Sequence, residues 1–293
     1  LGREEGKLSL APNTRAELVP GLEDAVPEAI AAGCHHSLVV AQGVVYAWGS
    51  NSNGQLGQLR GAGFSSANPT PEAIPSSSLG GDNGARTTQA RAGGTFSLVE
   101  TVGSSGKIQL WSFGANRYGQ LGRATGAGQD STNLQPGLVA LAGDLRESAA
   151  GRHHALALTS EGLYSWGGNR FGQLGRETGS GTDAPNYFPT LVDAAMFDGE
   201  TLAEVRAGRM HTVVRTLQGS VFCFGSNLRG QCGPAAGDRN QPGSDAPNPL
   251  ATRLPSALFD GLPVVAIDAG QYHTLARTLD GRIWGFGRNF YGQ

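Results

Sequence analysis

The chain has 293 residues and a net charge of −2 from 22 basic and 24 acidic residues, and it carries 46 glycines and 15 prolines. This balanced charge gives no excess of positive charge that would favour binding to nucleic acid or to an anionic membrane. No apolar run reaches the roughly 18 residues that span a bilayer. So many glycines without a collagen period predict many tight turns, and therefore many short strands.

The first recurring element reads Ala-Gly, two variable residues, then His and Ser or Thr. Its copies follow one another at intervals of 57 to 62 residues and begin at Ala32, Ala92, Ala150, Ala207 and Ala269. The second copy has Phe96 in place of the histidine. Self-similarity at a nearly fixed period indicates a repeat architecture, which decides the fold before any local assignment.

The second element reads aromatic, any residue, aromatic, Gly. Its copies lie at 46–49, 111–114, 164–167, 222–225 and 284–287. Residues two apart on a strand share a face, so both aromatics of each copy are expected to enter the same layer of core. A glycine turn separates this element from the first one, which predicts a β-hairpin.

The third element reads Asn, two variable residues, then Gly-Gln-Leu-Gly, with Cys232 replacing the leucine once. Its copies begin at Asn51, Asn116, Asn169, Asn227 and Asn289. Asn and Gly accept a left-handed backbone, so a compact turn with one apolar anchor is expected. A variable loop and two short apolar pieces complete each repeat, giving about four short strands, the content of one propeller blade.

These elements predict an all-β fold, a β-propeller with four short antiparallel strands per blade. We expect a single domain over 1–293, with an incomplete repeat at 1–30 and full or partial repeats at about 31–90, 91–149, 150–206, 207–268 and 269–293. Residues 1–4 match 174–177, so the chain opens and stops inside the third element. Because a propeller closes to remove its edge strands, we expect a segment of a longer array.

The three elements in this order resemble the regulator of chromosome condensation repeat family, from about residue 15 to residue 293. The resemblance implies a propeller that usually has seven blades, five of whose repeats would be present here. The family includes an exchange factor for the small GTPase Ran, a plant ultraviolet-B photoreceptor and domains of large ubiquitin ligases. Since one fold serves many functions, the resemblance implies the fold more firmly than the activity.

The leading hypothesis is a non-catalytic scaffold for protein partners, or a structural subunit of a large complex. The alternative, from the resemblance alone, is a guanine-nucleotide exchange factor for a small GTPase. A third is an inhibitor that plugs an enzyme with a loop. Light sensing is not implied, because the family's photoreceptor has Trp after Ala-Gly, where this chain has Cys34, Gly94, Arg152, Arg209 and Gln271. Chromatin binding is not implied either, because the chain has no basic run.

One arc of residues is a candidate partner-binding surface, because equivalent turns of successive repeats lie on one rim of a propeller. Arginine and aromatic side chains are enriched at protein interfaces. The alternative interpretation is aromatic packing beneath solvated arginines. The candidates are Arg117, Tyr118, Arg170, Phe171, Arg229 and Arg288.

Four histidines occupy the histidine position of the first element: His36, His154, His211 and His273. A ring of histidines suggests a metal site, but Phe96 at the equivalent position cannot ligate. We expect buried histidines that bond backbone within each blade. No metal, cofactor or catalytic constellation is predicted.

The cysteines are Cys34, Cys223 and Cys232. An odd count without regular spacing argues against a disulfide framework. We therefore expect Cys223 and Cys232 to be small apolar fillers and the chain to belong to an intracellular, reducing compartment.

Overall fold

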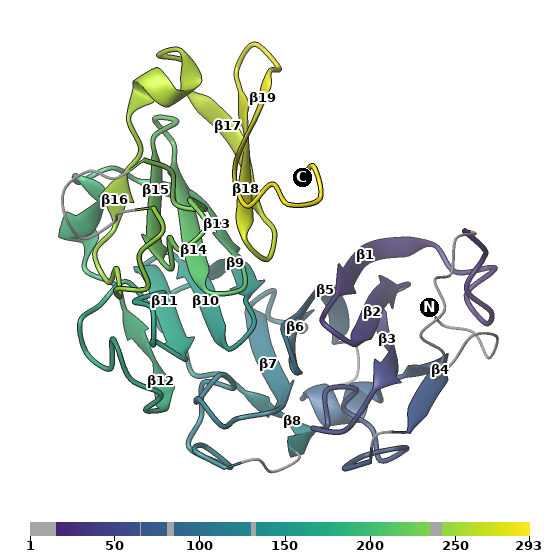
Figure 1. The fold of residues 1–293 in the computed structure, drawn as a ribbon. Coiled ribbons are helices and arrows are strands. Elements are labelled where there is room, and N and C mark those ends of the chain that lie inside the picture. Colours follow the sequence, from purple (N-terminus) through teal and green to yellow (C-terminus); the bar gives the residue numbers. More distant parts are fainter. Residues whose placement is uncertain (1–15, 65, 81–84, 130–132, 235–241) are drawn as a thin grey trace. The chain divides into compact units, whose positions relative to one another are not determined.

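The computed structural model describes residues 16–64, 66–80, 85–129, 133–234 and 242–293 (Figure 1). These residues form antiparallel β-sheets and short 3₁₀ helices, and no α-helix occurs among them. No helix in this part of the chain is long and apolar enough to cross a membrane. The predicted match at residues 1–4 lies outside the described residues. The chain divides into two compact units, and the second consists of Tyr118–Gly128 and Leu141–Gln293.

The first unit contains two four-stranded sheets, each with its strands in chain order. A short 3₁₀ helix, η1 (Ser76–Leu79), lies between them in the sequence. Their strands are β1 (Pro27–Ala32), β2 (His36–Ala41), β3 (Val44–Ser50) and β4 (Ala67–Ala73), then β5 (Arg86–Ala92), β6 (Phe96–Val102), β7 (Ile108–Gly114) and β8 (Asn133–Leu138).

The second unit contains two sheets of four strands and one of three described strands. The 3₁₀ helices η2 (Ala194–Phe197) and η4 (Ser256–Phe259) each follow the fourth strand of a sheet. The strands are β9 (Leu145–Ala150), β10 (His154–Thr159), β11 (Gly162–Gly167) and β12 (Asn186–Leu191), then β13 (Leu202–Ala207), β14 (His211–Thr216), β15 (Val221–Gly225) and β16 (Thr252–Arg253), then β17 (Val264–Ala269), β18 (His273–Thr278) and β19 (Ile283–Gly287).

These sheets confirm the all-β prediction and the count of four strands per blade, but each sheet is offset from the repeat as read from Ala-Gly. The strand that leads into Ala-Gly is the first strand of the sheet that follows. In the third sheet β9 ends at Ala150, which pairs with Ala155 of β10. The offset arises because the Ala-Gly turn joins the first and second strands of one antiparallel sheet. This turn therefore lies within a blade and not between two blades.

The paired aromatics enter the core as predicted. Phe222 and Phe224 of β15 are both buried and belong to one cluster with Val205 and Val214. The leucine of the third element is a buried anchor, and Leu174 is 0% exposed. Burying one such side chain contributes about 1.5–3 kcal/mol.

The glycine of Ala-Gly allows consecutive repeats to approach closely. A Cβ atom built on Gly208 would lie 2.1 Å from Cε1 of His211 and 2.7 Å from the carbonyl oxygen of Gly270 in the next repeat. Real Cβ contacts are longer than this, so any side chain would separate the two turns.

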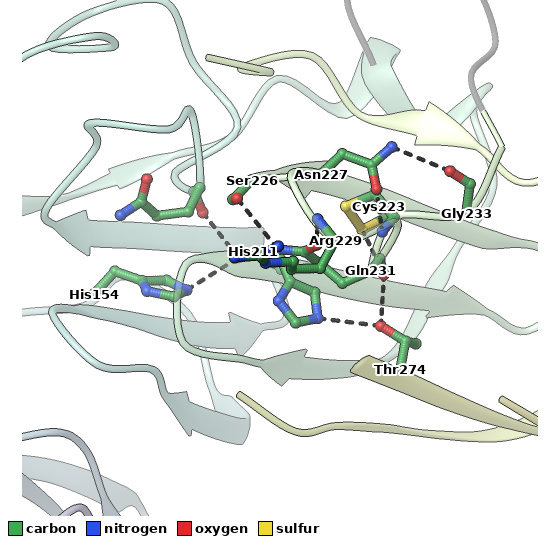
Figure 2. The surroundings of a disulfide bond; sticks show 12 residues. His154, His211, Cys223, Ser226, Asn227, Arg229, Gln231, Gly233 and Thr274 are labelled. Atoms are coloured by element: carbon green, nitrogen blue, oxygen red, sulfur yellow. Dashed lines mark hydrogen bonds between the residues drawn. A yellow bond between two sulfur atoms is a disulfide. The ribbon is translucent and has the colours of Figure 1, made fainter. Parts of the chain in front are cut away.

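The buried histidines bond the next repeat and not the backbone of their own blade, so that prediction is wrong. The Nε2 atom of His211 lies 3.1 Å from Oγ1 of Thr274, and Nε2 of His154 lies 3.2 Å from Oγ1 of Thr212 (Figure 2). His36 bonds Oγ of Ser97 in the same way at 3.0 Å. No group of three or more His, Cys, Asp or Glu side chains among the described residues could hold a metal ion.

Each hydroxyl also donates to a carbonyl, which decides the histidine tautomer. Oγ1 of Thr274 donates to the carbonyl of Gln231 at 2.7 Å, so its oxygen accepts from Nε2–H of His211. Nδ1 of His211 then carries the lone pair, and it is buried without a hydrogen-bond partner among the described residues. Burial lowers the pKa of His211 to about 3, because a second ring proton would have no acceptor.

Candidate interaction surface

The turn of the third element is held by its asparagine side chain. Oδ1 of Asn169 accepts from the amide of Leu174 at 3.0 Å, and Nδ2 donates to the carbonyls of Arg176 and Thr178, both at 2.9 Å. The expected compact turn with an apolar anchor is present, and its left-handed residues are glycines such as Gly172 (φ 83°) and not the asparagine. Asn169 is conformationally ordinary, and its role is to close the loop.

The glutamine of Gly-Gln-Leu-Gly orients the tip of the same turn. Its buried side chain accepts from the amide of the residue two positions before it, which is one of the predicted surface residues in three repeats. The predicted side chains thus extend from a rigid backbone. The pairs are Gln120 with Tyr118 at 2.9 Å, Gln173 with Phe171 at 2.9 Å and Gln231 with Arg229 at 2.8 Å.

The fourth repeat closes its turn with a disulfide between Cys223 and Cys232 (Figure 2). In the third repeat the equivalent connection is a hydrogen bond from Oγ of Ser165 to the carbonyl of Leu174, at 2.7 Å. The prediction that these two cysteines are unpaired fillers is wrong, and the cysteines no longer argue for a reducing compartment. Cys34 is the free, exposed cysteine.

The variable residues of the first element lie beside the third element of the same repeat. The amide of Gly168 donates to the carbonyl of His153 at 2.7 Å, and the amide of Arg288 donates to that of Tyr272 at 2.8 Å. Consecutive turns are also linked, because the amide of Arg209 donates to the carbonyl of Gln271 at 3.2 Å. The Ala-Gly turns and the turns and loops of the third element thus lie at one end of the sheets of the second unit, which we call the turn end. It comprises 118–128, 151–153, 168–185, 208–210, 226–234, 242–248, 270–272 and 288–293.

Tyr118 and Phe171 are half-buried, as aromatic packing beneath the arginines would require. The ring of Tyr118 lies 4.7 Å from the ring of His153, at an interplanar angle of 47°. Burial, with the positive charge of Arg152, lowers the pKa of His153 to about 4, so its ring is neutral at physiological pH. Arg117 is exposed and belongs to the first unit, whereas the other candidates belong to the second.

Arg170 and Arg229 are both exposed at the tips of their turns. Arg170 pairs with Asp183 at 3.0 Å, an exposed ion pair of little energetic weight. Arg229 makes no such pair with a described residue.

Arg288 lies among three rings. Its Cζ is 5.7 Å from the ring centroid of Tyr272, 5.3 Å from that of Phe290 and 5.4 Å from that of Tyr291. Cζ of Arg209 lies 5.1 Å from the centroid of Tyr272, so one tyrosine contacts two guanidinium groups. Such cation–π contacts are each worth about 0.5–1 kcal/mol at exposed positions. Arg209 and Tyr272 were missed from the sequence, although both occupy the variable positions after Ala-Gly.

Several turn-end arginines have no acidic partner in the part of the chain that the structure describes. Elsewhere in the unit Arg206 pairs with Glu147 at 2.6 Å, and Arg215 pairs with Glu204 at 2.8 Å. At the turn end, Nε of Arg209 is buried with no hydrogen-bond partner in the described part of the chain. Four turn-end arginines form neither an ion pair nor a side-chain hydrogen bond with any described residue: Arg152, Arg209, Arg229 and Arg288. Arg176 also forms no ion pair with a described residue, but its guanidinium donates to Ser165. The turn end therefore presents aromatic surface and arginine charge that the described carboxylates neutralise only in part.

Comparison with known proteins agrees with this fold. The regulator of chromosome condensation (RCC1) repeat profile matches residues 42–99, 109–158, 160–215 and 218–277, and a second profile of that repeat matches 203–231 and 264–293. In a solved structure, Prp20p from Saccharomyces cerevisiae aligns with a TM-score of 0.65 and 23% identity, over 88% of this chain and 56% of that one.

Two curated relatives cover most of the chain. The probable E3 ubiquitin-protein ligase HERC6 of Homo sapiens is 32% identical over 96% of this chain and 26% of its own length. The ultraviolet-B receptor UVR8 of Arabidopsis thaliana is 29% identical over 90% of this chain and 53% of its own length. The chain thus spans from about a quarter to about half of these relatives.

The fold and the site define a β-propeller repeat protein with an arginine and aromatic surface at one end of its blades. The chain belongs to the regulator of chromosome condensation repeat family. The resemblance read from the three sequence elements is confirmed. The predictions of seven blades and of a single domain stay predictions.

Proposed function

We propose that this chain is a non-catalytic interaction module that binds an acidic segment of a partner protein through the turn end of its second unit. The observation that carries the proposal is the set of four arginines with neither an ion pair nor a side-chain hydrogen bond to a described residue, two of which flank Tyr272. A partner carboxylate would supply the missing charge and accept the bonds that these guanidiniums offer.

The construction of the surface supports binding with a small entropic cost. The backbone at Arg229 is held by Gln231, and the guanidinium of Arg288 lies near three aromatic rings that attract it. Groups that are already ordered lose little freedom on binding, and arginine and tyrosine dominate the energetics of many interfaces.

The test uses fluorescence anisotropy of a labelled peptide made of Glu, Asp and Tyr, titrated with the 293-residue chain. We expect binding that weakens with added salt, and at least about a tenfold loss of affinity in the double variant Arg229→Gln/Arg288→Gln. Arg277→Gln, which changes an exposed arginine outside the turn end, is the control. Equal affinity for the double variant and the control would refute the proposal.

The second candidate is a guanine-nucleotide exchange factor for a small GTPase. It is supported by the shared fold with Prp20p, whose structure is described together with its binding properties to Gsp1p and histones. Release of a fluorescent nucleotide from small GTPases decides between the two functions. Acceleration by micromolar chain supports exchange activity, and an unchanged rate rejects it for the GTPases assayed.

A further inference from the structure

The opposite end of the same sheets forms a second surface. Each strand runs from one end of its sheet to the other, so the β-hairpin turns and the 3₁₀ helices lie away from the turn end. Neighbouring blades are joined there, because the amide of Val264 at the start of β17 donates to the carbonyl of Gly219 in the β14–β15 turn at 3.0 Å. We call this part the hairpin end, and it comprises 141–144, 160–161, 192–201, 217–220, 254–263 and 279–282.

The two ends carry opposite charge. The turn end has seven arginines and three carboxylates: Arg123, Arg152, Arg170, Arg176, Arg209, Arg229 and Arg288 against Glu177, Asp183 and Asp245. The ranges of the hairpin end hold seven carboxylates and one arginine: Asp144, Glu161, Asp193, Asp198, Glu200, Asp260 and Asp280 against Arg282. Two further arginines border it, Arg146 on the hollow described below and Arg253, which pairs with Asp198 and Glu200, so carboxylates remain in excess. A partner that suits one end is therefore repelled by the other.

The hairpin end also has an apolar hollow of about 220 Å³ at the junction of two blades, one with strands β9–β12 and the other with β13–β16. Its apolar lining comes from both blades and from η2, and it includes Leu158, Leu163, Leu191, Phe197 and Leu202. Such a space accommodates one aliphatic side chain. Two leucines at equivalent positions of the β14–β15 and β18–β19 hairpin turns, Leu217 and Leu279, are each 69% exposed at the same end.

Free carboxylates border this hollow. Glu161 lines it and, like its neighbour Asp144, forms no ion pair with a described residue. Glu200 also lines it, but its carboxylate is already bonded to Thr216 and paired with Arg253 at 3.0 Å. Arg146 is exposed on the same lining and adds one positive charge.

We propose that the hairpin end of the second unit is a second docking surface, which binds a basic segment of a partner protein and takes one aliphatic side chain of that segment into the hollow. Charge complementarity selects the basic partner, and the apolar lining selects the side chain. This surface is independent of the arginine surface at the turn end, so one module can join an acidic partner to a basic one.

The test uses a labelled peptide in which leucines alternate with pairs of Lys and Arg, and a control peptide with Glu in place of each basic residue. The variant Ala194→Trp fills the hollow from η2, and Ala195→Trp adds the same ring to an exposed position of η2 that does not line it. Glu161→Lys reverses a free charge, and Asp245→Lys makes the same change at the turn end. Thermal unfolding confirms that each variant folds.

We expect salt-sensitive binding of the basic peptide, with a loss of about tenfold in Ala194→Trp and in Glu161→Lys and no loss in either control. If Ala194→Trp does not fold, the comparison of Glu161→Lys with its control Asp245→Lys decides the test. Equal binding of the two peptides would overturn the proposal, as would unchanged affinity in Glu161→Lys. Self-association of the chain that Glu161→Lys and Arg288→Gln both abolish would also overturn it, since the occupant would then be a second copy.

Discussion

Acidification should destabilise the second unit through its two fully buried histidines. Burial, together with the charge of neighbouring histidines, lowers the pKa of His154 and of His211 to about 3. In the unfolded chain a histidine has a pKa near 6.5. As the pH falls below about 6.5 the unfolded state therefore binds more protons than the folded state, so stability decreases as the pH falls.

The magnitude follows from the two pKa values of each histidine. Between about pH 7 and pH 5 one histidine with a folded pKa of about 3 lowers the free energy of unfolding by about 2 kcal/mol, so both together lower it by about 4 kcal/mol. This is a large part of the stability of an ordinary domain, about 5–15 kcal/mol.

The sequence suggests a variant that removes the contribution of His211 to the loss of stability at low pH. The repeat with Phe96 in place of His is followed by a repeat with Ala155 in place of Ser or Thr. The double variant His211→Phe/Thr274→Ala copies this combination, and its loss of stability on acidification should be about 2 kcal/mol smaller than that of the wild type. Thr274→Ala alone keeps the buried histidine and should keep the full loss.

Urea unfolding followed by tryptophan fluorescence, at about pH 7 and about pH 5, measures these differences. A double variant that loses as much stability on acidification as the wild type would refute the reasoning, because the buried ring of His211 would then not be the group that titrates.

Three further changes test the packing by thermal unfolding. Gly208→Ala should cost about 3 kcal/mol or more, because its Cβ would meet His211 at 2.1 Å. Leu174→Asp should cost about 2–5 kcal/mol, because a charge would replace a fully buried anchor. Cys223→Ser/Cys232→Leu should keep the fold, because it copies the third repeat, and should lose about 2–3 kcal/mol of stability from the short disulfide loop.

Matched controls separate these effects from general sensitivity to substitution. Gly103→Ala has no heavy atom within 4 Å of the added Cβ and should leave the melting temperature nearly unchanged. Leu217→Asp places the same charge on a side chain that is 69% exposed and should cost little. The cysteine prediction fails if the double variant does not fold, and the other two fail if a variant melts like its control.

The sequence by itself determined the repeat, the strands and the buried anchors. Paired aromatics such as Phe222 and Phe224 share a face because side chains alternate along any strand. Glycine turns and leucine anchors such as Leu174 also depend on local geometry, which an isolated repeat already specifies. Copies of one local pattern must form copies of one local structure, so five repeats were enough to predict the blades.

Only the tertiary structure decided which residues of different repeats meet. It paired His211 with a hydroxyl in the next repeat, and it placed Tyr272 between Arg209 and Arg288. It also joined Cys223 to Cys232 across a turn, where the sequence spacing suggested no partner. These contacts depend on the distance and rotation between neighbouring sheets and on the path of each loop, and periodicity along a single strand carries no information about either.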